Sequence, residues 1–315
     1  MIEQLARHLA PLTTVNLAVR RGPTRELRGV TVTEAPRLDA EELPSADVLI
    51  GGLAQPGSER LLDLPASKGA PLFLFQGYGA PGNPRVSEML RRRPRVLAVS
   101  SFVAQRASEH GCEVALVRPG LDGATFTAGE PCARRAPVVA MMTHAVDWKA
   151  TEDGLAALDR VRAAVPEVEV RLFGASAPAV DLGSAHLGEL SRSGVAQLLR
   201  DASVFVCPSL EEGLGLPGIE ALACGAALAT TDTQGARDYA IDGQTALVTP
   251  PGRPDLLAAS VIRLLRAAAL RGELARRGRE HVLATYRPWP QTAERFHRAI
   301  ATLLGVTPPT AVATS

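Results

Sequence analysis

Residues 208–225 read PSLEEGLGLPGIEALACG, and they are the part of the chain that indicates its fold most directly. It follows an apolar run typical of a buried strand, and its second half has the composition of a helix. Gly213 and Gly215 allow the backbone to approach a ligand closely, and the amino end of the helix offers unpaired N–H groups and a positive dipole end. The stretch therefore predicts a strand, a loop and a helix that bind an anion, with phosphate as the favoured one.

Two glutamates flank this loop. Glu212 lies within it, and Glu220 comes eight residues later, which predicts that Glu220 lies in the first turn of the helix and that both carboxylates point into one crevice. A carboxylate beside a phosphate is repelled unless it binds hydroxyls, and sugars and ribose carry vicinal hydroxyls. The alternative is that both are helix-start charges favoured by the dipole, and the glycines make it the weaker interpretation.

Strand and helix patterns alternate along nearly the whole chain, which predicts an α/β fold with mainly parallel sheets. The alternation restarts after a segment that is rich in Gly, Pro, Thr and Ala and has no period. We therefore expect two domains, each a twisted sheet wrapped by helices, that face each other across a cleft. The expected parts are a first domain at 1–122, a linker at 123–136, a second domain at 137–287, a helix at 291–304 that returns to the first domain, and a flexible tail at 305–315.

The expected strands and helices come from apolar runs and from apolar residues at helical spacing. The strands are expected at 13–20, 29–34, 46–52, 71–76, 95–100, 113–118, 137–142, 169–173, 203–207, 227–231 and 246–248. The helices are expected at 2–9, 59–66, 85–92, 102–109, 150–165, 194–200, 218–224, 255–270 and 291–304.

Composition excludes several classes of protein. The chain has 315 residues, of which 46% are hydrophobic, and its 34 basic and 33 acidic residues give a net charge of +1, which argues against a nucleic-acid partner. No uncharged apolar run reaches the ~18 residues of a membrane span, and the acid in Met1-Ile2-Glu3-Gln4 argues against a secretory signal. The four scattered cysteines predict neither a disulfide framework nor a metal site. We therefore expect a cytoplasmic protein. The basic run at residues 91–95 leaves peripheral contact with a membrane open, although a solvated surface is favoured.

Lysine is rare in this chain. Only Lys68 and Lys149 are lysines among the 34 basic residues, which suggests that arginine serves wherever a general positive charge suffices. A lysine that is retained can mark a site that needs a compact ammonium, because lysine and arginine are not interchangeable at specific sites. Chance survival of either lysine alone is the competing interpretation.

Residues 208–225 resemble the E-x7-E signature of retaining glycosyltransferases of family 4, which have the two-domain GT-B fold. The similarity continues through Thr231-Asp232-Thr233-Gln234-Gly235 and includes Leu187-Gly188-Glu189-Leu190-Ser191 upstream. It covers residues 137–305 well and the first half loosely. The resemblance implies a GT-B fold with two Rossmann-like domains and a donor site on the second.

Carried over to this chain, the family pattern implies roles for individual residues. Glu212 would bind hydroxyls of the donor sugar, Glu220 the ribose hydroxyls, and Lys149 the diphosphate. The backbone amides that would hold the sugar and diphosphate belong to Gly213, Leu214, Gly215 and Leu216.

The chain departs from the family pattern in several places. His144 stands where the family usually has arginine, and it could donate one hydrogen bond to a phosphate but not a bidentate pair. Gln76 stands where the family has a histidine that reaches the donor sugar. The opening strand with its glycine-rich loop has no counterpart, because residues 2–9 already have a helical pattern. We therefore expect an abbreviated or reorganised amino-terminal domain.

The resemblance implies a retaining, metal-independent transfer of a sugar from a nucleoside-diphosphate sugar to a hydroxyl acceptor, with no cofactor besides that donor. Lys149 and the helix amino end would stabilise the departing diphosphate, and Glu212 would orient the donor. The acceptor, which could be a natural product, a glycolipid or a polysaccharide precursor, and the oligomeric state stay open.

Two other functions also stay open. One is an inactive glycosyltransferase-like subunit that binds nucleotide sugar, suggested by Gln76 and the absent opening loop. The other is an NAD-dependent oxidoreductase, because Gly213, Gly215 and Gly218 match GxGxxG and Asp232 follows at the end of the next expected strand.

Overall fold

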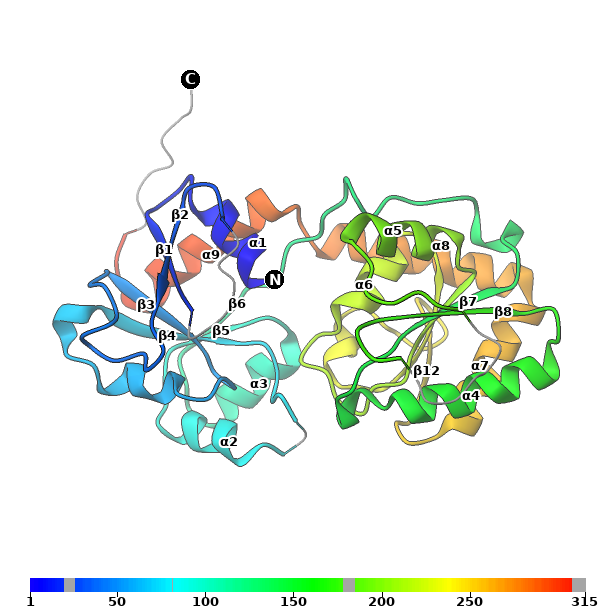
Figure 1. The fold of residues 1–315 in the computed structure, drawn as a ribbon, viewed down its shortest axis with the longest axis horizontal. Coiled ribbons are helices and arrows are strands. Elements are labelled where there is room, and N and C mark those ends of the chain that lie inside the picture. Colours follow the sequence, from blue (N-terminus) through cyan, green and yellow to red (C-terminus); the bar gives the residue numbers. More distant parts are fainter. Residues whose placement is uncertain (20–25, 81, 178–184, 308–315) are drawn as a thin grey trace, which may run out of the picture. The chain divides into compact units, whose positions relative to one another are not determined.

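The computed structural model describes residues 1–19, 26–80, 82–177 and 185–307 (Figure 1). Contacts divide the chain into two compact units, Met1–Gly120 with Arg287–Ser315 and Leu121–Tyr286. All strand pairings between named strands are parallel, as the alternation predicts, so the expected α/β class is confirmed. Most of the expected tail, residues 308–315, lies outside the described residues.

The second unit holds one six-stranded sheet. Its strands are β7 (Val138–Met142), β8 (Glu169–Phe173), β9 (Ala185–His186), β10 (Val204–Cys207), β11 (Ala227–Thr231) and β12 (Leu247–Thr249). They lie in the order β12-β11-β10-β7-β8-β9. This is the doubly wound Rossmann order, in which the chain reverses direction across the sheet between the two central strands, β7 and β10.

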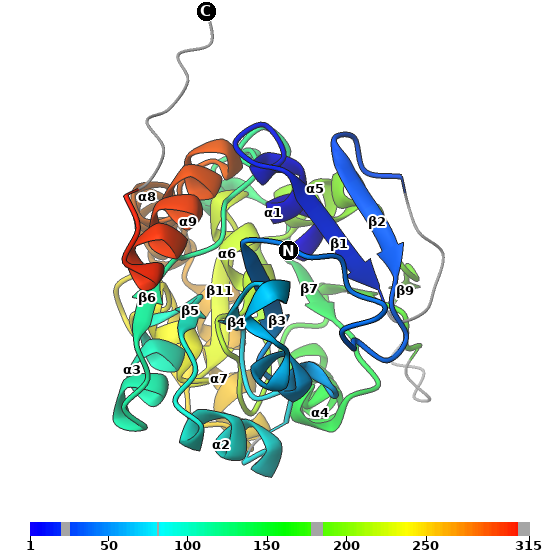
Figure 2. The same cartoon turned by 90° about the vertical axis from the view of Figure 1, so that its left-hand side faces the viewer.

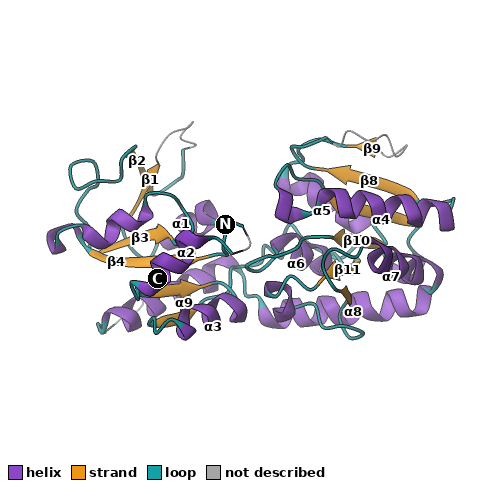
Figure 3. Cartoon of the chain, turned by 90° about the horizontal axis from the view of Figure 1, so that it is seen from below, coloured by secondary structure: helices purple, strands orange, loops and turns teal. Residues whose placement is uncertain are grey.

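Helices cover both faces of this sheet (Figure 3). α4 (Thr151–Ala164) and α7 (Pro254–Arg266) pack together on one face, and α5 (Arg192–Asp201), α6 (Leu216–Ala223) and α8 (Ala268–Thr285) lie on the other (Figure 1). The strands are apolar on both faces because both are covered. Met141 and Val206 of the central strands and Leu158 and Val261 of the helices are buried in the same core.

The first unit holds two smaller sheets (Figure 2). β1 (Val15–Val19) and β2 (Val30–Glu34) form a pair, and β3 (Val48–Gly52), β4 (Ala70–Phe75), β5 (Val96–Ala98) and β6 (Val114–Leu116) form a row in chain order. The helices of this unit are α1 (Ile2–Leu9), α2 (Pro84–Arg91), α3 (Ser101–Glu109) and α9 (Trp289–Leu304).

In its described residues, the first unit has the strand order of the second unit but no counterpart of β7, the first strand of the second unit. In the second unit, β7 precedes a helix and pairs with both β8 and β10. In the first unit, α1 is followed by the pair β1-β2 and then by the row that starts at β3, and no described strand pairs with both β1 and β3. Ile50 of β3 is 41% exposed, whereas Val204, Phe205 and Val206 of β10 are buried. The split of the sheet agrees with the expected abbreviated domain.

The largest differences between the expected and the observed helices are at residues 59–66 and 255–270. The helix expected at 59–66 is a pair of 3₁₀ helices, η1 (Ser58–Asp63) and η2 (Ala66–Lys68), because Pro65 favours an extended conformation at Leu64 and ends the first one. The helix expected at 255–270 ends at Arg266, and the whole of α8 follows it. α8 was not expected, because its glycines suggest that a helix ends there. In the structure they allow close packing, since a Cβ on Gly278 would lie 2.5 Å from the Leu222 side chain.

Residues 123–136, expected to be a linker, pack against the second unit instead. Cys132, in the 3₁₀ helix η3 (Cys132–Arg134), is buried, and its thiol donates a hydrogen bond to the Ser203 carbonyl (3.1 Å). The buried guanidinium of Arg135 donates hydrogen bonds to three backbone carbonyls, those of Leu199, Ala202 and Cys224. Individual side chains attach this segment to the second unit, and it presents no regularly spaced apolar face. Its apolar residues therefore show no periodic spacing in the sequence.

The chain end lies in the first unit, where α9 packs against α1 and β6. Its first residue, Trp289, stacks on the His8 ring with 6.1 Å between ring centroids. Trp289 also lies against Gly120, where a Cβ would come within 2.5 Å of the indole ring. Phe296, one turn further along the apolar stripe, is 2% exposed. The helix expected at 291–304 therefore contributes to the core of this unit.

Candidate functional site

Two loops meet at the point where the strand order of the second sheet reverses. Residues 143–150 follow β7, and residues 208–215 follow β10. The Leu210 N–H donates a hydrogen bond to the Trp148 carbonyl (2.8 Å), which joins the loops. Ligands of doubly wound sheets bind beyond the carboxyl ends of the strands at this reversal. The candidate residues of both loops therefore lie where a ligand is expected.

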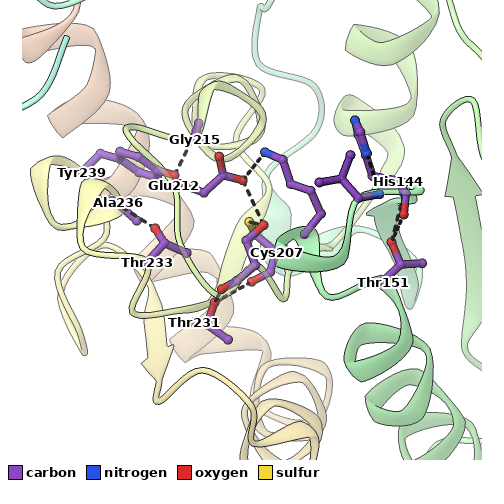
Figure 4. A network of polar contacts seen from close by, with 12 residues as sticks. His144, Thr151, Cys207, Glu212, Gly215, Thr231, Thr233, Ala236 and Tyr239 are labelled. Carbon is purple, nitrogen blue, oxygen red and sulfur yellow. Dashed lines mark hydrogen bonds and ion pairs between the residues drawn. The ribbon is translucent and has the colours of Figure 1, made fainter. Parts of the chain in front are cut away.

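Lys149 and Glu212 form an ion pair between the two loops (Figure 4). The Lys149 Nζ lies 2.6 Å from Glu212 Oε1, and the two side chains are only 30% and 13% exposed. Lys149 ends the 3₁₀ helix η4 (Asp147–Lys149), and the next residue, Ala150, has a φ of 49°, a strained conformation for alanine. The Ser209 hydroxyl donates to the same Oε1 (2.9 Å). Within the described residues, Glu212 Oε2 accepts no hydrogen bond, so this oxygen can accept one from a ligand.

The loop after β11 supports the backbone of Glu212. The Glu212 N–H donates to the Thr233 carbonyl, and the Gly235 N–H donates to the Glu212 carbonyl, both at 3.2 Å. A Cβ on Gly235 would lie 2.3 Å from that carbonyl oxygen, so a side chain there would displace the loop. The Thr231 hydroxyl donates to the Ser209 carbonyl. These contacts hold the Glu212 carboxylate in place beside Lys149.

A buried tyrosine supports the glycine loop. Gly215 has a φ of 93° at the amino end of α6, and its carbonyl accepts a hydrogen bond from the Tyr239 hydroxyl (2.9 Å; Figure 4). Tyr239 is 1% exposed. The Leu214 and Leu216 N–H groups have no acceptor among the residues that the structure describes. The first N–H groups of a helix need partners from outside it, so this end of α6 can bind an anion.

Glu220 lies in the second turn of α6, so its expected place in the first turn is wrong. The helix begins at Leu216, two residues before the expected start. The Glu220 carboxylate is 17% exposed, and burial raises its pKa to about 7 against the opposing charge of Arg192. The structure pairs Glu220 with Arg192 and gives it no hydrogen bond or ion pair to Glu212 or Lys149.

His144 begins the loop of Lys149. Its backbone N–H donates to the Thr151 hydroxyl (3.0 Å), which in turn donates to the His144 carbonyl (2.8 Å). The Val146 N–H donates to His144 Nδ1 (3.1 Å), so in the neutral ring Nε2 carries the hydrogen. Nε2 can therefore donate one hydrogen bond. The last candidate, Gln76, follows β4 in the first unit with an exposed side chain, and its role stays a prediction.

Sequence reasoning missed Tyr239 and Arg192. Tyr239 is one of only three tyrosines in the chain, and Arg192 directly follows residues 187–191, which belong to the resemblance. Neither of these features of the sequence shows what the Tyr239 or Arg192 side chain contacts. The dinucleotide alternative is disfavoured by the topology. The loop with Gly213, Gly215 and Gly218 follows the fourth strand of its unit, whereas a dinucleotide fingerprint follows the first. Asp232 is engaged by Arg237 at 2.6 Å.

The described ranges contain neither a cluster of metal-ligating side chains nor a helix that could cross a membrane. Within them, no three His, Cys, Asp or Glu side chains gather in a group that could hold a metal ion. Of the helices in those ranges, none combines the length and the apolar character that crossing a membrane requires. In the basic run at residues 91–95, Arg92 pairs with Asp63 and Arg95 with Glu113.

Comparison with known sequences finds a family that resembles the second unit. Residues 130–281 match the profile of the family described as glycosyl transferases group 1. A glycogen synthase of Mycobacterium tuberculosis is 27% identical over 186 residues, which cover 55% of this chain and 45% of that protein. A D-inositol 3-phosphate glycosyltransferase of Mycobacteroides abscessus is 31% identical over 188 residues, which cover 51% of this chain and 42% of that protein. The chain thus spans less than half the length of these relatives.

Comparison with solved structures covers both units. A sucrose-phosphate synthase from Thermosynechococcus elongatus matches with a TM-score of 0.78 and 19% identity over 96% of this chain and 92% of that one. Anabaena HepE, in complex with UDP and glucose, matches with a TM-score of 0.77 and 13% identity over 95% of each chain. At these identities the likeness shows the fold. The chain therefore has the GT-B fold, and its residues 130–281 match the family described as glycosyl transferases group 1.

Proposed function

We propose that this protein transfers a sugar from a nucleoside-diphosphate sugar to a hydroxyl group of an acceptor. The observation that carries the proposal is the Lys149–Glu212 ion pair beside the amino end of α6, at the reversal of the second sheet. A diphosphate needs positive charge as it departs, and a sugar ring needs acceptors for its hydroxyls. The two members of the pair supply these functions side by side.

Each site residue has a part in this proposal. The Lys149 ammonium and the N–H groups at the start of α6 bind the diphosphate, and Glu212 accepts hydrogen bonds from sugar hydroxyls. Glu220 accepts hydrogen bonds from the ribose hydroxyls, and His144 Nε2 donates one to a phosphate oxygen. Gln76 is the proposed contact of the first unit with the donor sugar.

The proposed chemistry retains the configuration of the donor and does not require a metal ion. The acceptor oxygen forms a bond to the anomeric carbon on the face from which the diphosphate oxygen departs. A donor phosphate oxygen takes the acceptor proton. Lys149 stabilises the charge that develops on the diphosphate, and Glu212 orients the sugar without forming a covalent bond. These features, and membership of family 4, rest on the resemblance of residues 208–225.

UDP-glucose is the first donor to test, because the Anabaena HepE structures contain UDP and UDP-glucose. Calorimetry with UDP, ADP, GDP and NAD comes first, followed by donor turnover with hydroxyl acceptors and assignment of the anomeric configuration of the product by NMR. We expect one nucleoside diphosphate to bind and NAD not to bind. Binding of NAD alone would contradict the proposal, and an inverted product would contradict retention.

One observation favours a second candidate, an inactive subunit that binds nucleotide sugar. Among the described residues of the first unit, no strand pairs with both β1 and β3 in the way that β7 pairs with both β8 and β10. Nucleotide binding without turnover of any donor, hydrolysis included, would support this candidate. Turnover that is lost in Glu212→Gln and Lys149→Ala would exclude it.

A further inference from the structure

Arg192 lies between two carboxylates of the second unit. It is the first residue of α5, directly after Ser191, whose hydroxyl accepts a hydrogen bond from the Gly194 N–H and caps the helix. Arg192 Nη1 lies 3.8 Å from Glu220 Oε1, and Nη2 lies 3.6 Å from Asp122 Oδ2. The guanidinium also lies over the Phe126 ring, 5.1 Å from its centroid.

The environment of Glu220 opposes its ionisation. Its carboxylate is 17% exposed, and burial raises its pKa to about 7. Within the second unit, the charged groups that face Glu220 are Arg192 of α5 and Asp122, which lies in the segment before β7. Arg279 of α8 instead donates to the Ala223 carbonyl at the far end of α6. Arg192 lowers the pKa of Glu220, and Asp122 acts in the opposite direction.

The long separation between Arg192 and Glu220 matters for ligand binding. A bidentate guanidinium at ordinary hydrogen-bond distance would use both carboxylate oxygens. At 3.8 Å the charge of Arg192 still stabilises the carboxylate, but both oxygens can accept hydrogen bonds from a ligand. Asp122 and the Phe126 ring hold the guanidinium at that distance. Asp122 is itself held by the Thr125 N–H, which donates to its Oδ1 (3.1 Å).

We propose that Arg192 is a positioning residue that keeps Glu220 ionised and free to accept hydrogen bonds from both ribose hydroxyls of the donor. The proposal rests on the proposed function, in which Glu220 binds the ribose. An ionised carboxylate accepts hydrogen bonds from two hydroxyls, whereas a protonated one must itself donate and loses acceptor strength. Arg192 therefore lowers the pH above which the ribose is bound well, because it opposes the effect of burial on Glu220, and it does so without touching the nucleotide.

The test compares nucleotide affinity between pH 6 and 9 in the wild type, Arg192→Gln and Arg192→Lys. The probe is whichever of UDP, ADP and GDP the wild type binds most tightly. Its 2′,3′-dideoxy analogue reports the ionisation of the phosphates alone, because it lacks the hydroxyls that Glu220 would bind. The ratio of the two affinities isolates the contribution of the hydroxyls. Arg160→Gln, an exposed change on α4, is the matched control.

We expect the affinity ratio of the wild type to fall below pH 7 as Glu220 takes up a proton. In Arg192→Gln the midpoint should move up by about one pH unit, so that the ratio at pH 7 is about fivefold lower and recovers by pH 9. Arg192→Lys should stay close to the wild type. A loss in Arg192→Gln that is equal at every pH, or no loss, would overturn the proposal.

Two other results would refute the proposed function itself, and both differ from an equal or absent loss of affinity in Arg192→Gln. Failure of the wild type to bind any nucleoside diphosphate would refute the donor site. Equal affinity of the probe and its dideoxy analogue at pH 9 would remove Glu220 from the ribose contact, and the proposed role of Arg192 would be refuted with it. Melting temperatures of the variants show whether a loss of affinity comes from unfolding.

Discussion

The Lys149 ammonium donates a 2.6 Å hydrogen bond to the carboxylate of Glu212, which is 63 residues away in the chain. Both groups are largely buried, so each would lose solvation without a partner if the other were absent. The pair therefore keeps a cation and an anion beside the start of α6.

Replacing Lys149 should weaken nucleotide binding even where the charge is kept. In Lys149→Arg the planar guanidinium is too large to occupy the place of the compact ammonium. We therefore expect about tenfold weaker binding of a nucleoside diphosphate, about 1.4 kcal/mol. Lys149→Ala should lose about 1.5–3 kcal/mol. Calorimetry measures both, and Lys68→Arg, at the other lysine of the chain and in the first unit, is the matched control. Unchanged affinity in Lys149→Arg would remove this residue from the site.

The contact of Tyr239 with the glycine loop should tolerate no added methyl group. A Cβ on Gly218 would lie 2.6 Å from the Tyr239 hydroxyl, so Gly218→Ala should reduce the free energy of unfolding by about 1–3 kcal/mol and weaken nucleotide binding by displacing the loop. Urea unfolding and calorimetry measure the two effects. Gly123→Ala, at a position where a Cβ meets nothing within 4 Å, is the control. Equal behaviour of the two variants would mean that the loop is not held by this contact.

The raised pKa of Glu220 should make the protein less stable as the pH rises. The folded state holds a proton on Glu220 up to about pH 7, whereas the unfolded chain releases it near pH 4.5. The free energy of unfolding therefore falls between pH 4.5 and 7 and stays lower above that range. Glu220→Gln should remove this slope and exceed the wild type in stability at pH 8, by up to about 3 kcal/mol.

Urea unfolding at a series of pH values measures this effect. Glu167→Gln, which replaces an exposed glutamate of the same unit, is the control and should follow the wild-type pH dependence. Parallel stability curves for Glu220→Gln and the wild type would show that burial does not shift this carboxyl group.

Shortening the apolar stripe of α9 should destabilise the first unit. Phe296 is 2% exposed, and Phe296→Ala should cost about 3–5 kcal/mol. Hydrogen exchange measured by mass spectrometry should then speed up in α1 and β6, which pack against α9, while the second unit is unchanged. Glu294→Ala, an exposed change on the same helix, should leave exchange as in the wild type. Protection of α1 that survives Phe296→Ala would contradict a role for α9 in this core.

Much of the fold could be predicted because its signals are local. Residues 208–225 contain the end of a buried strand, a glycine loop and the start of a helix without interruption, so their order in the chain is their order in space. The structure has these elements as β10, the loop with Gly215 at φ 93°, and α6. Continuous apolar runs likewise predicted parallel strands, because strands covered on both faces need apolar residues on both.

Other elements could not be predicted because their signals resemble those of loops. α8 is rich in arginine and contains Gly272 and Gly278, which suggest a break in isolation. In the structure these glycines let the helix approach Ala133 and Leu222. Cys132 and Arg135 belong to a segment without a period, and only the partners that they meet in the folded chain show that the segment is part of the second unit.

Most elements along the chain, the glycine loop, and the presence of the carboxylates and the lysine follow from the local sequence. Only the folded chain shows that Lys149 contacts Glu212, that Tyr239 supports Gly215, and that Arg192 faces Glu220. These relations depend on distance and burial, which the sheet order sets by placing β7 beside β10 although the chain passes through β8 and β9 between them. The same glutamate side chain has an ordinary pKa in an unfolded chain and one of about 7 at position 220, because folding removes the water that would stabilise its charge.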